Sequence, residues 1–377
     1  MLKFVEAVLI LVGMIIGVGM FAIPFSFTQA GFWLGALELL ILAVVVVLLH
    51  LLYAEVVLAT PELHRMPGYV RVYLGARAAI LSRASSIFGI LGTLLAYVLL
   101  GAVFLHGIFR YIFPNSSEAL WAVALVAIGA LITYSPLRRA AFINGILTAL
   151  LVFFTILLIA FLLPRVELSH IRGFELSQMF IPYGVLLFAL TGGTVIPDVI
   201  TLLGRRRKKA RQAIVIGTLL PAAVYFFFAF AVVGVSGNEV TENAIQGLLP
   251  AAGGFIVFWG NMIGFLAVIT SYIVLNKSFQ QMLMLDFMFS KVAAWGAGIF
   301  SPFLLYIAGF TSFIALIGTV GSIALGIDAG LLIAMYMSLH AKGEGRRIWY
   351  SQVWKVGIIY AVILAAICYH LYHLLPI

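Results

Sequence analysis

Long runs of apolar residues, separated by short stretches rich in charge, proline or glycine, follow one another along the whole chain. A helix needs about 20 mostly apolar residues to cross roughly 30 Å of hydrocarbon, and these runs are long enough. They predict about eleven membrane-spanning helices, near 5–31, 34–58, 85–112, 119–135, 140–163, 178–202, 212–235, 253–280, 295–313, 317–339 and 352–374. The pattern indicates an all-α integral membrane protein with one transmembrane domain, 1–377, and no separate soluble domain.

The composition agrees with a bilayer as the solvent of the chain. Of the 377 residues 64% are hydrophobic and 9% are charged, with a mean hydropathy of +1.19, whereas soluble domains carry about 25% charged residues. The first run stays apolar well past the length of a signal peptide, so we interpret it as the first span. A single cysteine, Cys368, cannot form an internal disulfide. We expect no cofactor, with Na⁺ as a candidate coupling ion.

The basic residues set the expected orientation. Most of the 22 Lys and Arg lie on one side of the membrane if the N-terminus is cytoplasmic, with the largest group at 205–211. Because basic loops stay inside, we predict a cytoplasmic N-terminus and an extracytoplasmic C-terminus in the cell membrane. This topology accounts for the net charge of +9 without a nucleic-acid partner. We expect a monomer or weak oligomer surrounded by membrane lipid.

Two of the predicted spans are interrupted in the same way. Gly19 to Pro24 reads GMFAIP in the first span, and Gly192 to Pro197 reads GGTVIP in the sixth. Unwound backbone at membrane depth is tolerated where protein or a water-filled cavity satisfies it, and two such breaks in corresponding positions point to a binding site. The spacing predicts an inverted repeat, 1–163 and 178–339, followed by an extra helix at 352–374.

A simpler interpretation of the same glycines and prolines remains open. Gly13 and Gly17 could form a GxxxG packing face, and the prolines could merely kink their helices. The matched pair at repeat spacing favours the binding site over this interpretation.

Around these breaks the sequence resembles a known transporter family. The motifs are IIGVGMFAIP in the first span, LLYAEV at the end of the second, FALTGGTVIPDV in the sixth, and RRRKKARQAIVIGTLLPAAVYFFFAFAVVG leading through the seventh. They are similar to the amino acid/polyamine/organocation superfamily with the leucine-transporter (LeuT) fold and, more narrowly, to the hydroxy/aromatic amino acid permease family. The resemblance implies broken first and sixth helices and a small-molecule amino-acid substrate.

The resemblance also implies a set of substrate-facing residues. They are Ile15, Gly17, Val18 and Gly19 of the first span and Phe188, Ala189, Thr191 and Thr194 of the sixth. Tyr97, midway along the third span, resembles a family tyrosine whose hydroxyl faces the substrate carboxylate. The alternative for Tyr97 is an aromatic side chain that fills a helix interface.

A cation site is implied by the eighth span. Thr270 and Ser271, with Ala267 one turn earlier, match the superfamily's sodium site, to which the backbone of Gly13 and Ile16 would add oxygens that suit a hard cation. Hydroxyls in membrane helices also bond carbonyls of their own helix, which is the alternative. In some relatives a lysine of the fifth span replaces sodium, so the resemblance implies that the absence of a basic residue from 142–163 favours sodium over a proton.

Ionisable groups at membrane depth are functional candidates by default. We predict that Glu55, Asp198 and Lys277 meet at the inner side as a cytoplasmic gate or proton relay, although Lys277 could instead extend its amine to the interface. Asp328 lies deepest, with a gating or coupling role or a simple interhelical hydrogen bond as the alternatives. His50 is interpreted as a packed helix-face residue.

These features predict a secondary active transporter for neutral amino acids, coupled to sodium or protons and working by alternating access. Two alternatives stay open: a proton-coupled aromatic amino-acid permease, and a transport-dead amino-acid sensor on the same fold. An enzyme is not expected, because the sequence lacks GxSxG and HExxH motifs and Asp328 lies in LGIDAG without GxGD spacing. A channel is not expected either, because the sequence lacks a repeat that could form a selectivity filter of backbone carbonyls.

Overall fold

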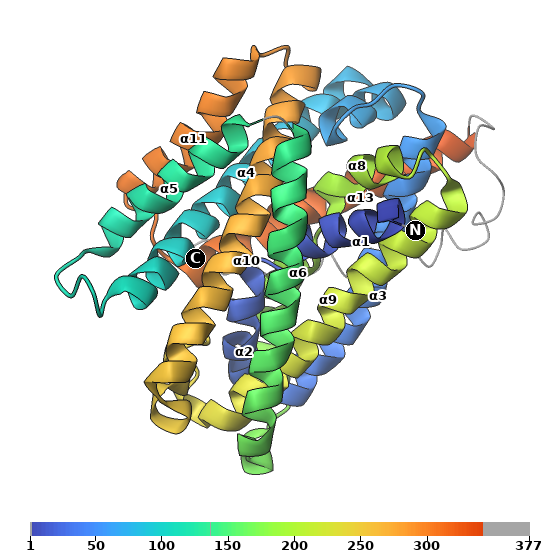
Figure 1. Ribbon diagram of the computed structural model, residues 1–377. Coiled ribbons are helices and arrows are strands. Elements are labelled where there is room, and N and C mark those ends of the chain that lie inside the picture. Colours follow the sequence, from blue (N-terminus) through green and yellow to red (C-terminus); the bar gives the residue numbers. More distant parts are fainter. Residues whose placement is uncertain (1, 136, 342–377) are drawn as a thin grey trace, which may run out of the picture.

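The computed structural model describes residues 2–135 and 137–341, and this part of the chain is helical without strands. Figure 1 shows the helices as one bundle. The helices are α1 (Leu2–Ile15), α2 (Gly19–Ala30), α3 (Phe32–Ala59), α4 (Met66–Phe109), α5 (Glu118–Tyr134), α6 (Leu137–Leu162), α7 (Phe180–Leu190), α8 (Ile196–Leu202), α9 (Arg207–Ser236), α10 (Leu249–Asp286), α11 (Lys291–Ile307), α12 (Phe313–Thr319) and α13 (Leu325–Ala341). A 3-10 turn, Gly193–Val195, joins α7 to α8, and a π-helical turn, Val320–Ala324, joins α12 to α13.

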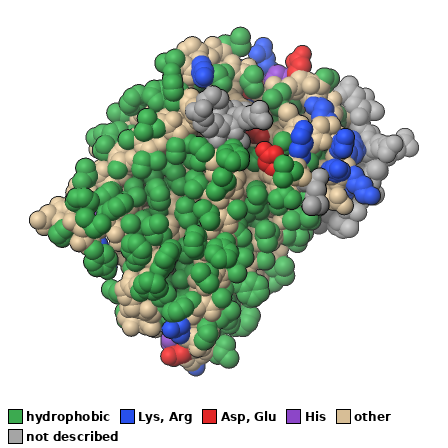
Figure 2. Space-filling model, viewed as in Figure 1, with side chains coloured by type: hydrophobic (Ala, Val, Ile, Leu, Met, Phe, Trp, Pro, Cys, Tyr) green, Lys and Arg blue, Asp and Glu red, His purple; other side chains and the backbone are tan. Residues whose placement is uncertain are grey.

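The described helices have the lengths and composition of membrane spans. Seven helical segments are long and apolar enough to cross a bilayer, and α1 with α2 would make an eighth as one bent span. The helices α5 and α11 are apolar but shorter, with 17 residues each. Together these segments fall on the first ten predicted spans, whereas the eleventh, 352–374, lies outside the described residues. On the face in Figure 2, hydrophobic side chains form a broad band, with charged side chains gathered towards its ends.

The two short helices at the N-terminus lie inside the bundle. The helix α1 packs against α6, α9 and α10, and α2 packs against α7 and α9. The ring of Phe21 in α2 is fully buried, and its centroid lies 4.8 Å from that of Phe104 and 5.7 Å from that of Phe228. By contrast, Leu131 of α5 and Phe153 of α6 are exposed, as lipid-facing residues would be. The interrupted first helix therefore occupies the protein interior, where its freed backbone groups can find partners.

One segment differs from the sequence-based expectation. The stretch 61–84 is hydrophilic, and the third span is predicted to begin at 85, yet α4 begins at Met66 and changes direction at Gly75, whose φ is +85°. The first part of α4 is amphipathic: Tyr69 and Tyr73 are buried while Arg71 is exposed. A hydropathy average misses such a helix because its arginines and its buried aromatics cancel.

Candidate functional site

The first break lies between α1 and α2. Helical hydrogen bonding stops at Ile15 and resumes at Gly19, and the two helix axes are bent by 51°. The carbonyls that α1 leaves without helical partners are satisfied by other helices. Ser271 of α10 donates its hydroxyl towards the carbonyl oxygens of Gly13 and Ile16, at 3.0 and 3.2 Å, and the hydroxyl of Tyr225 in α9 donates to the carbonyl of Ile15.

The second break lies between α7 and α8. The helix α7 ends at Leu190, and Pro197 stands in the first turn of α8, where its missing N–H leaves no vacant hydrogen bond. The backbone N–H of Gly192 donates to Nε2 of His50 in α3 at 3.1 Å. The Thr191 hydroxyl donates to the Leu187 carbonyl of its own helix at 2.6 Å. Bonds within the segment and one bond to the neighbouring helix α3 thus hold this break.

The hydroxyl of Tyr225 connects the two breaks. Besides the Ile15 carbonyl at the end of α1, it reaches the Ala189 carbonyl near the end of α7 at 3.0 Å. Its side chain is fully buried. Because buried carbonyls cost free energy when they lack a donor, one phenol stabilises both helix ends in this arrangement. The sequence analysis did not single out Tyr225, whose only signal is a lone hydroxyl in the aromatic run VYFFFAF.

The breaks approach each other closely. A Cβ atom on Gly19 would lie 2.7 Å from both Cα and Cβ of Ala189, so no larger residue fits there without displacing α7. A Cβ on Gly17 would lie 2.8 Å from the Ser271 hydroxyl and 3.3 Å from the Tyr97 hydroxyl. Glycine at these positions lets the backbone of α2 pack against the second break and against the hydroxyls of α4 and α10.

A cavity of about 150 Å³ opens at the breaks. All nine residues predicted to face a substrate line it: Ile15, Gly17, Val18, Gly19, Tyr97, Phe188, Ala189, Thr191 and Thr194. Apolar side chains such as Val46 and Leu49 form much of the remaining wall, and four titratable side chains, Arg65, His50, Tyr53 and Asp328, complete it together with Tyr97. The structure therefore brings the residues of both sequence motifs to one cavity.

The five residues of the predicted cation site lie beside this cavity. Ser271 bridges α10 to the carbonyls of Gly13 and Ile16, whereas the Thr270 hydroxyl bonds the carbonyls of Leu266 and Ala267 in its own helix. The alternative of own-helix bonding thus describes Thr270 but not Ser271. These hydroxyl and carbonyl oxygens suit a small hard cation. Among the described residues, no cluster of His, Cys, Asp and Glu could hold a metal ion.

The helix α6 adds polar atoms next to the predicted cation site. A Cβ on Gly13 would lie 2.3 Å from the Thr148 hydroxyl and 3.3 Å from Nδ2 of Asn144. Both side chains are buried, and Oδ1 of Asn144 has no hydrogen-bond partner among the described residues. The absence of basic residues from this span had suggested nothing about Asn144 and Thr148, so their amide and hydroxyl were not predicted.

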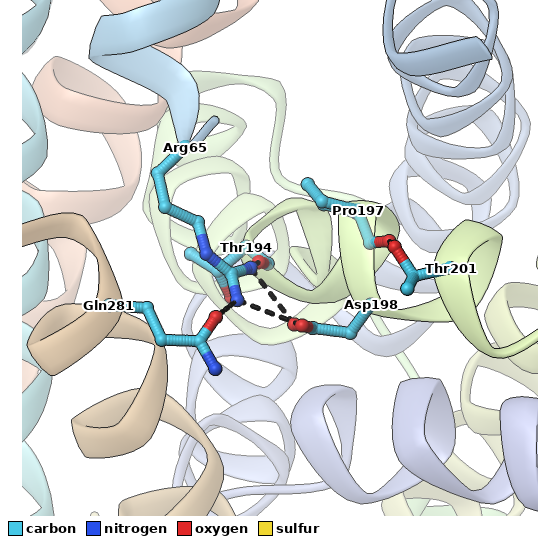
Figure 3. A network of polar contacts seen from close by, with 6 residues as sticks. All are labelled: Arg65, Thr194, Pro197, Asp198, Thr201 and Gln281. Carbon is cyan, nitrogen blue, oxygen red and sulfur yellow. Dashed lines mark hydrogen bonds and ion pairs between the residues drawn. The ribbon is translucent and has the colours of Figure 1, made fainter. Parts of the chain in front are cut away.

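A network around Arg65 lies at the edge of the cavity (Figure 3). Its guanidinium donates to both carboxylate oxygens of Asp198, at 2.8 and 2.9 Å, to the Thr194 carbonyl at 2.8 Å, and to the side-chain oxygen of Gln281. Only 5% of the Arg65 side chain is exposed. Burial lowers the pKa of Arg65, but the Asp198 carboxylate raises it, and the pKa ends above its ordinary value. Arg65 thereby ties α8 and α10 together at the start of α4.

The predicted meeting of Glu55, Asp198 and Lys277 is wrong in its partners. Asp198 pairs with Arg65, Glu55 pairs with Arg207 at 2.9 Å, and the Lys277 amine donates to the Ser135 carbonyl at 2.8 Å. In the part of the chain described, no hydrogen bond or ion pair joins any two of the three. Lys277 satisfies a carbonyl at the C-terminal end of α5, where a positive charge is favourable. The sequence predicts a common end of the bundle for these groups, but it does not predict their partners.

Asp328 lines the cavity from α13, as its depth in the sequence suggested. Its Oδ1 atom is buried without a hydrogen-bond partner in the described structure. The π-helical turn Val320–Ala324 immediately precedes its helix, and a Cβ on Gly321 in this turn would lie 2.0 Å from the Gly184 carbonyl of α7. Such π turns are frequent at functional sites.

His50 and Arg65 are the two cavity residues whose importance the sequence analysis missed. His50 is not merely packed, because Nε2 accepts from Gly192 and Nδ1 lies 3.0 Å from the Thr218 hydroxyl. Arg65 was counted only among the loop arginines that set topology. A histidine within an apolar span was the available signal for the first, whereas little distinguishes Arg65 from its neighbours in sequence.

Two known amino-acid transporters are similar in sequence to this chain, as the motifs lead one to expect. The chain is 22% identical to glutamine transporter 2 of Aliivibrio fischeri over 349 residues, which cover 90% of each chain. It is 25% identical to tyrosine-specific transport system 2 of Haemophilus influenzae over 254 residues, which cover 65% of this chain and 61% of the other.

Solved transporters share the fold. Mhp1, a nucleobase-cation-symport-1 family transporter, matches with a TM-score of 0.65 and 14% identity, covering 98% of this chain and 91% of the other. MhsT in complex with L-phenylalanine matches with a TM-score of 0.65 and 15% identity, covering 98% of each chain. A manganese transporter of Eremococcus coleocola matches with a TM-score of 0.70 and 14% identity, covering 98% of this chain and 86% of the other. These likenesses show the leucine-transporter type of fold.

The family follows from the sequence rather than from the fold. A sequence model described as the tryptophan/tyrosine permease family matches residues 1–373, nearly the whole chain. It agrees with the predicted resemblance to amino-acid permeases that rested on the motifs of the two breaks. The chain therefore belongs to the tryptophan/tyrosine permease family of amino-acid transporters.

Proposed function

We propose that this protein is a cation-coupled secondary transporter of neutral amino acids, with the substrate held in the cavity between the two breaks. One observation supports this proposal most: nine residues from three separate helical regions, all implied by family motifs, line one cavity. The glutamine and tyrosine transporters similar to this chain point to the same class of substrate.

The helix ends at the cavity suit a zwitterion. The N-terminus of α2 begins at Gly19, and a helix N-terminus offers free N–H groups and partial positive charge to a carboxylate. The C-terminal end of α7, at Leu190, offers carbonyls and partial negative charge to an ammonium group. Because Gly19 packs on Ala189, these opposite ends lie next to each other, which is the spacing that the two charged groups of one amino acid need.

The walls favour an uncharged side chain. Val46, Leu49, Ile90 and Phe188 supply apolar surface, while Arg65 is already paired with Asp198. A small-to-medium neutral amino acid meets these surroundings without burying an unpaired charge. The family description and the tyrosine-specific relative favour an aromatic substrate as the second candidate.

The coupling cation has a proposed position beside the substrate. The carbonyls of Gly13, Ile16 and Ala267 and the hydroxyls of Thr270 and Ser271 would bind Na⁺, with Ser271 releasing the carbonyls that it bonds in this structure. Ser271 and the substrate-facing Tyr97 both contact Gly17, so the cation would order one wall of the substrate cavity. This contact gives the coupling between the two ligands a direct structural path.

Alternating access would use the inverted repeat, 1–163 and 178–339, with the first two helices of each repeat rocking against the rest of the bundle. The network of Arg65, Asp198 and Gln281 would act as the gate at the end of the bundle that we expect to face the cytoplasm. The expected orientation places the N-terminus inside and the C-terminus outside. Asp328, with its unpartnered oxygen in the same cavity, is a further gating or coupling candidate.

The test begins with a thermal-shift screen of the purified protein against the amino acids, in sodium, potassium and at several pH values, because a bound ligand raises the stability of the folded state. The amino acids that bind are then assayed for uptake into proteoliposomes under sodium and pH gradients. We expect saturable, gradient-driven accumulation of at least one neutral amino acid. Binding without flux under any gradient would instead identify an amino-acid sensor.

The sodium position has its own test. The double variant T270A/S271A removes both hydroxyls and leaves the backbone carbonyls. We expect the sodium concentration needed for half-maximal uptake to rise by about 5- to 150-fold, the range that corresponds to a loss of about 1–3 kcal/mol. Uptake that keeps the sodium dependence of the unmodified protein would show that sodium does not bind there.

A further inference from the structure

We propose that His50 binds a coupling proton and that this proton controls the conformation of the second break. The inference rests on the proposed transport function and adds a proton site that the sequence motifs do not indicate. It requires no contact with the predicted sodium residues, because His50 lies on α3 and faces α9 and the turn between α7 and α8.

The hydrogen bonds fix the protonation state of the imidazole in this structure. The backbone nitrogen of Gly192 can only donate, so Nε2 of His50, 3.1 Å away, must carry the acceptor lone pair. In a neutral imidazole the other nitrogen then holds the hydrogen, and Nδ1–H donates to the Thr218 hydroxyl at 3.0 Å. His50 is 3% exposed, and both of its nitrogens are satisfied in this neutral form alone.

A proton on Nε2 is incompatible with this arrangement. It would place two N–H donors against each other across 3.1 Å, and the imidazolium would lose its hydrogen bond at Nε2. The Gly192 amide belongs to the break, where the chain is neither in α7 nor in α8, so it can rotate away at lower cost than a helical amide. Protonation of His50 would therefore release the backbone between Thr191 and Thr194, two residues that line the cavity.

Thermodynamic linkage makes the effect reciprocal. If protonation favours a rearranged second break, a rearrangement of that break must favour protonation by the same factor. A substrate that binds preferentially to one arrangement then binds or releases a proton as it binds. The hydrogen bond from Gly192 to His50 would thus couple proton movement to substrate movement.

Two charged or titratable side chains bond the second break, His50 at Gly192 and Arg65 at Thr194, and Arg65 keeps its charge, so His50 is the one whose charge can change. Tyr53, Arg65, Tyr97 and Asp328 share the cavity with it. Other titratable groups on the helices packed against α3 are Tyr183, Asp198, Arg207, Lys208, Lys209, Arg211, Tyr225, Tyr336 and His340. Several of these have partners of their own, since Asp198 pairs with Arg65, Arg207 pairs with Glu55, and Tyr225 bonds Ile15 and Ala189.

The test compares H50Q with H106Q in the full-length protein reconstituted into proteoliposomes. Glutamine can place an amide oxygen where Nε2 stands, which keeps an acceptor for Gly192 but removes the titratable group. We expect H50Q to lose pH-gradient-driven accumulation of the amino acid by about 5- to 150-fold, whereas its counterflow exchange, which needs no net proton movement, should fall by much less. His106, another histidine of a spanning helix, serves as the matched control, and H106Q should keep both activities.

A second variant keeps the inference testable if H50Q fails to fold. Thr218→Val preserves side-chain shape but removes the acceptor for Nδ1–H, so the pH dependence of counterflow should move, whereas Thr218→Ser should leave it unchanged. An H50Q protein that accumulates substrate normally along a pH gradient would overturn the inference, as would a wild-type protein whose accumulation follows sodium and ignores pH. In both cases transport itself would stand. Absence of counterflow for every amino acid would remove the proposed function instead.

Discussion

The two breaks share the spacing of glycine and proline but are held in different ways. The first, at Ile15 to Gly19, presents carbonyl oxygens, and neutral hydroxyls of Ser271 and Tyr225 satisfy them. The second, between α7 and α8, presents an N–H group to His50 and a carbonyl to Arg65. One break is therefore surrounded by uncharged donors, and the other is in contact with titratable or charged side chains.

The same sequence motif can therefore have different chemical surroundings at its two occurrences. Carbonyl oxygens with hydroxyl neighbours suit a metal cation, whereas a backbone amide held by an imidazole and a carbonyl held by a guanidinium suit proton control and gating. The first break thus becomes the candidate ion and carboxylate side of the cavity. The second becomes the candidate moving side.

The largest expected effect comes from removing Arg65 at the second break. R65A leaves the Asp198 carboxylate and the Thr194 carbonyl without their donor, and breaking a fully buried ion pair costs about 3–5 kcal/mol, an upper bound here because the Asp198 side chain is 29% exposed. We expect a lower unfolding temperature and loss of gradient-driven accumulation. R65K should recover only part of both, because an ammonium cannot form the two-pronged contact with Asp198.

The control for Arg65 is R71A, which removes an exposed arginine from the same helix. It should behave like the unmodified protein in both measurements. If R65A and R71A transport alike, the network of Figure 3 is not a gate.

The next effect tests the contact between the breaks. G19A would force a Cβ to within 2.7 Å of Ala189, and overpacking of this kind costs about 1–3 kcal/mol. If this cost falls on the state that binds substrate, substrate affinity, measured by thermal shift or calorimetry, should fall by about 5- to 150-fold, since each 1.4 kcal/mol is tenfold.

G145A is the matched substitution for G19A. A Cβ on Gly145 in α6 would meet nothing within 4 Å, so its affinity for substrate should be unchanged. Equal affinities in G19A and G145A would mean that the close approach of α2 and α7 does not shape the substrate site.

A smaller loss of stability is expected when the Tyr225 hydroxyl, which connects the two breaks, is removed. Y225F removes one hydroxyl and leaves the Ile15 and Ala189 carbonyls short of a donor, at a cost of about 1–3 kcal/mol. Thermal unfolding of Y225F should therefore occur at lower temperature. Y183F removes a buried hydroxyl that has no hydrogen-bond partner within the described residues and should not destabilise the protein. Equal unfolding temperatures would show that Tyr225 does not hold the two helix ends.

The sequence predicted the architecture well because membrane spans follow from apolar length. The first ten predicted spans all coincide with apolar helical segments, and the residues of both glycine motifs line one cavity. The amphipathic start of α4 escaped this reasoning, since its arginines lower the average hydropathy although Tyr69 and Tyr73 are buried. Periodicity, rather than average hydropathy, would have found it.

The partners of the charged residues could not be predicted. Asp198 and Arg65 are separated by 133 positions, and nothing in the spacing of either relates them. Grouping Glu55, Asp198 and Lys277 by their end of the bundle was reasonable, but hydrogen-bonding partners depend on rotamers and helix rotation, which composition does not encode. His50 was assigned to packing for the same reason: its partners, Gly192 and Thr218, lie on other helices.

A structure of the protein with its transported amino acid would show whether a neutral amino acid binds between the two breaks. We predict ligand density in the cavity, with the carboxylate at the N-terminus of α2 near Gly17 and Gly19 and the side chain towards Phe188. Ligand density at any other place, with this cavity filled only by solvent or closed, would contradict the account.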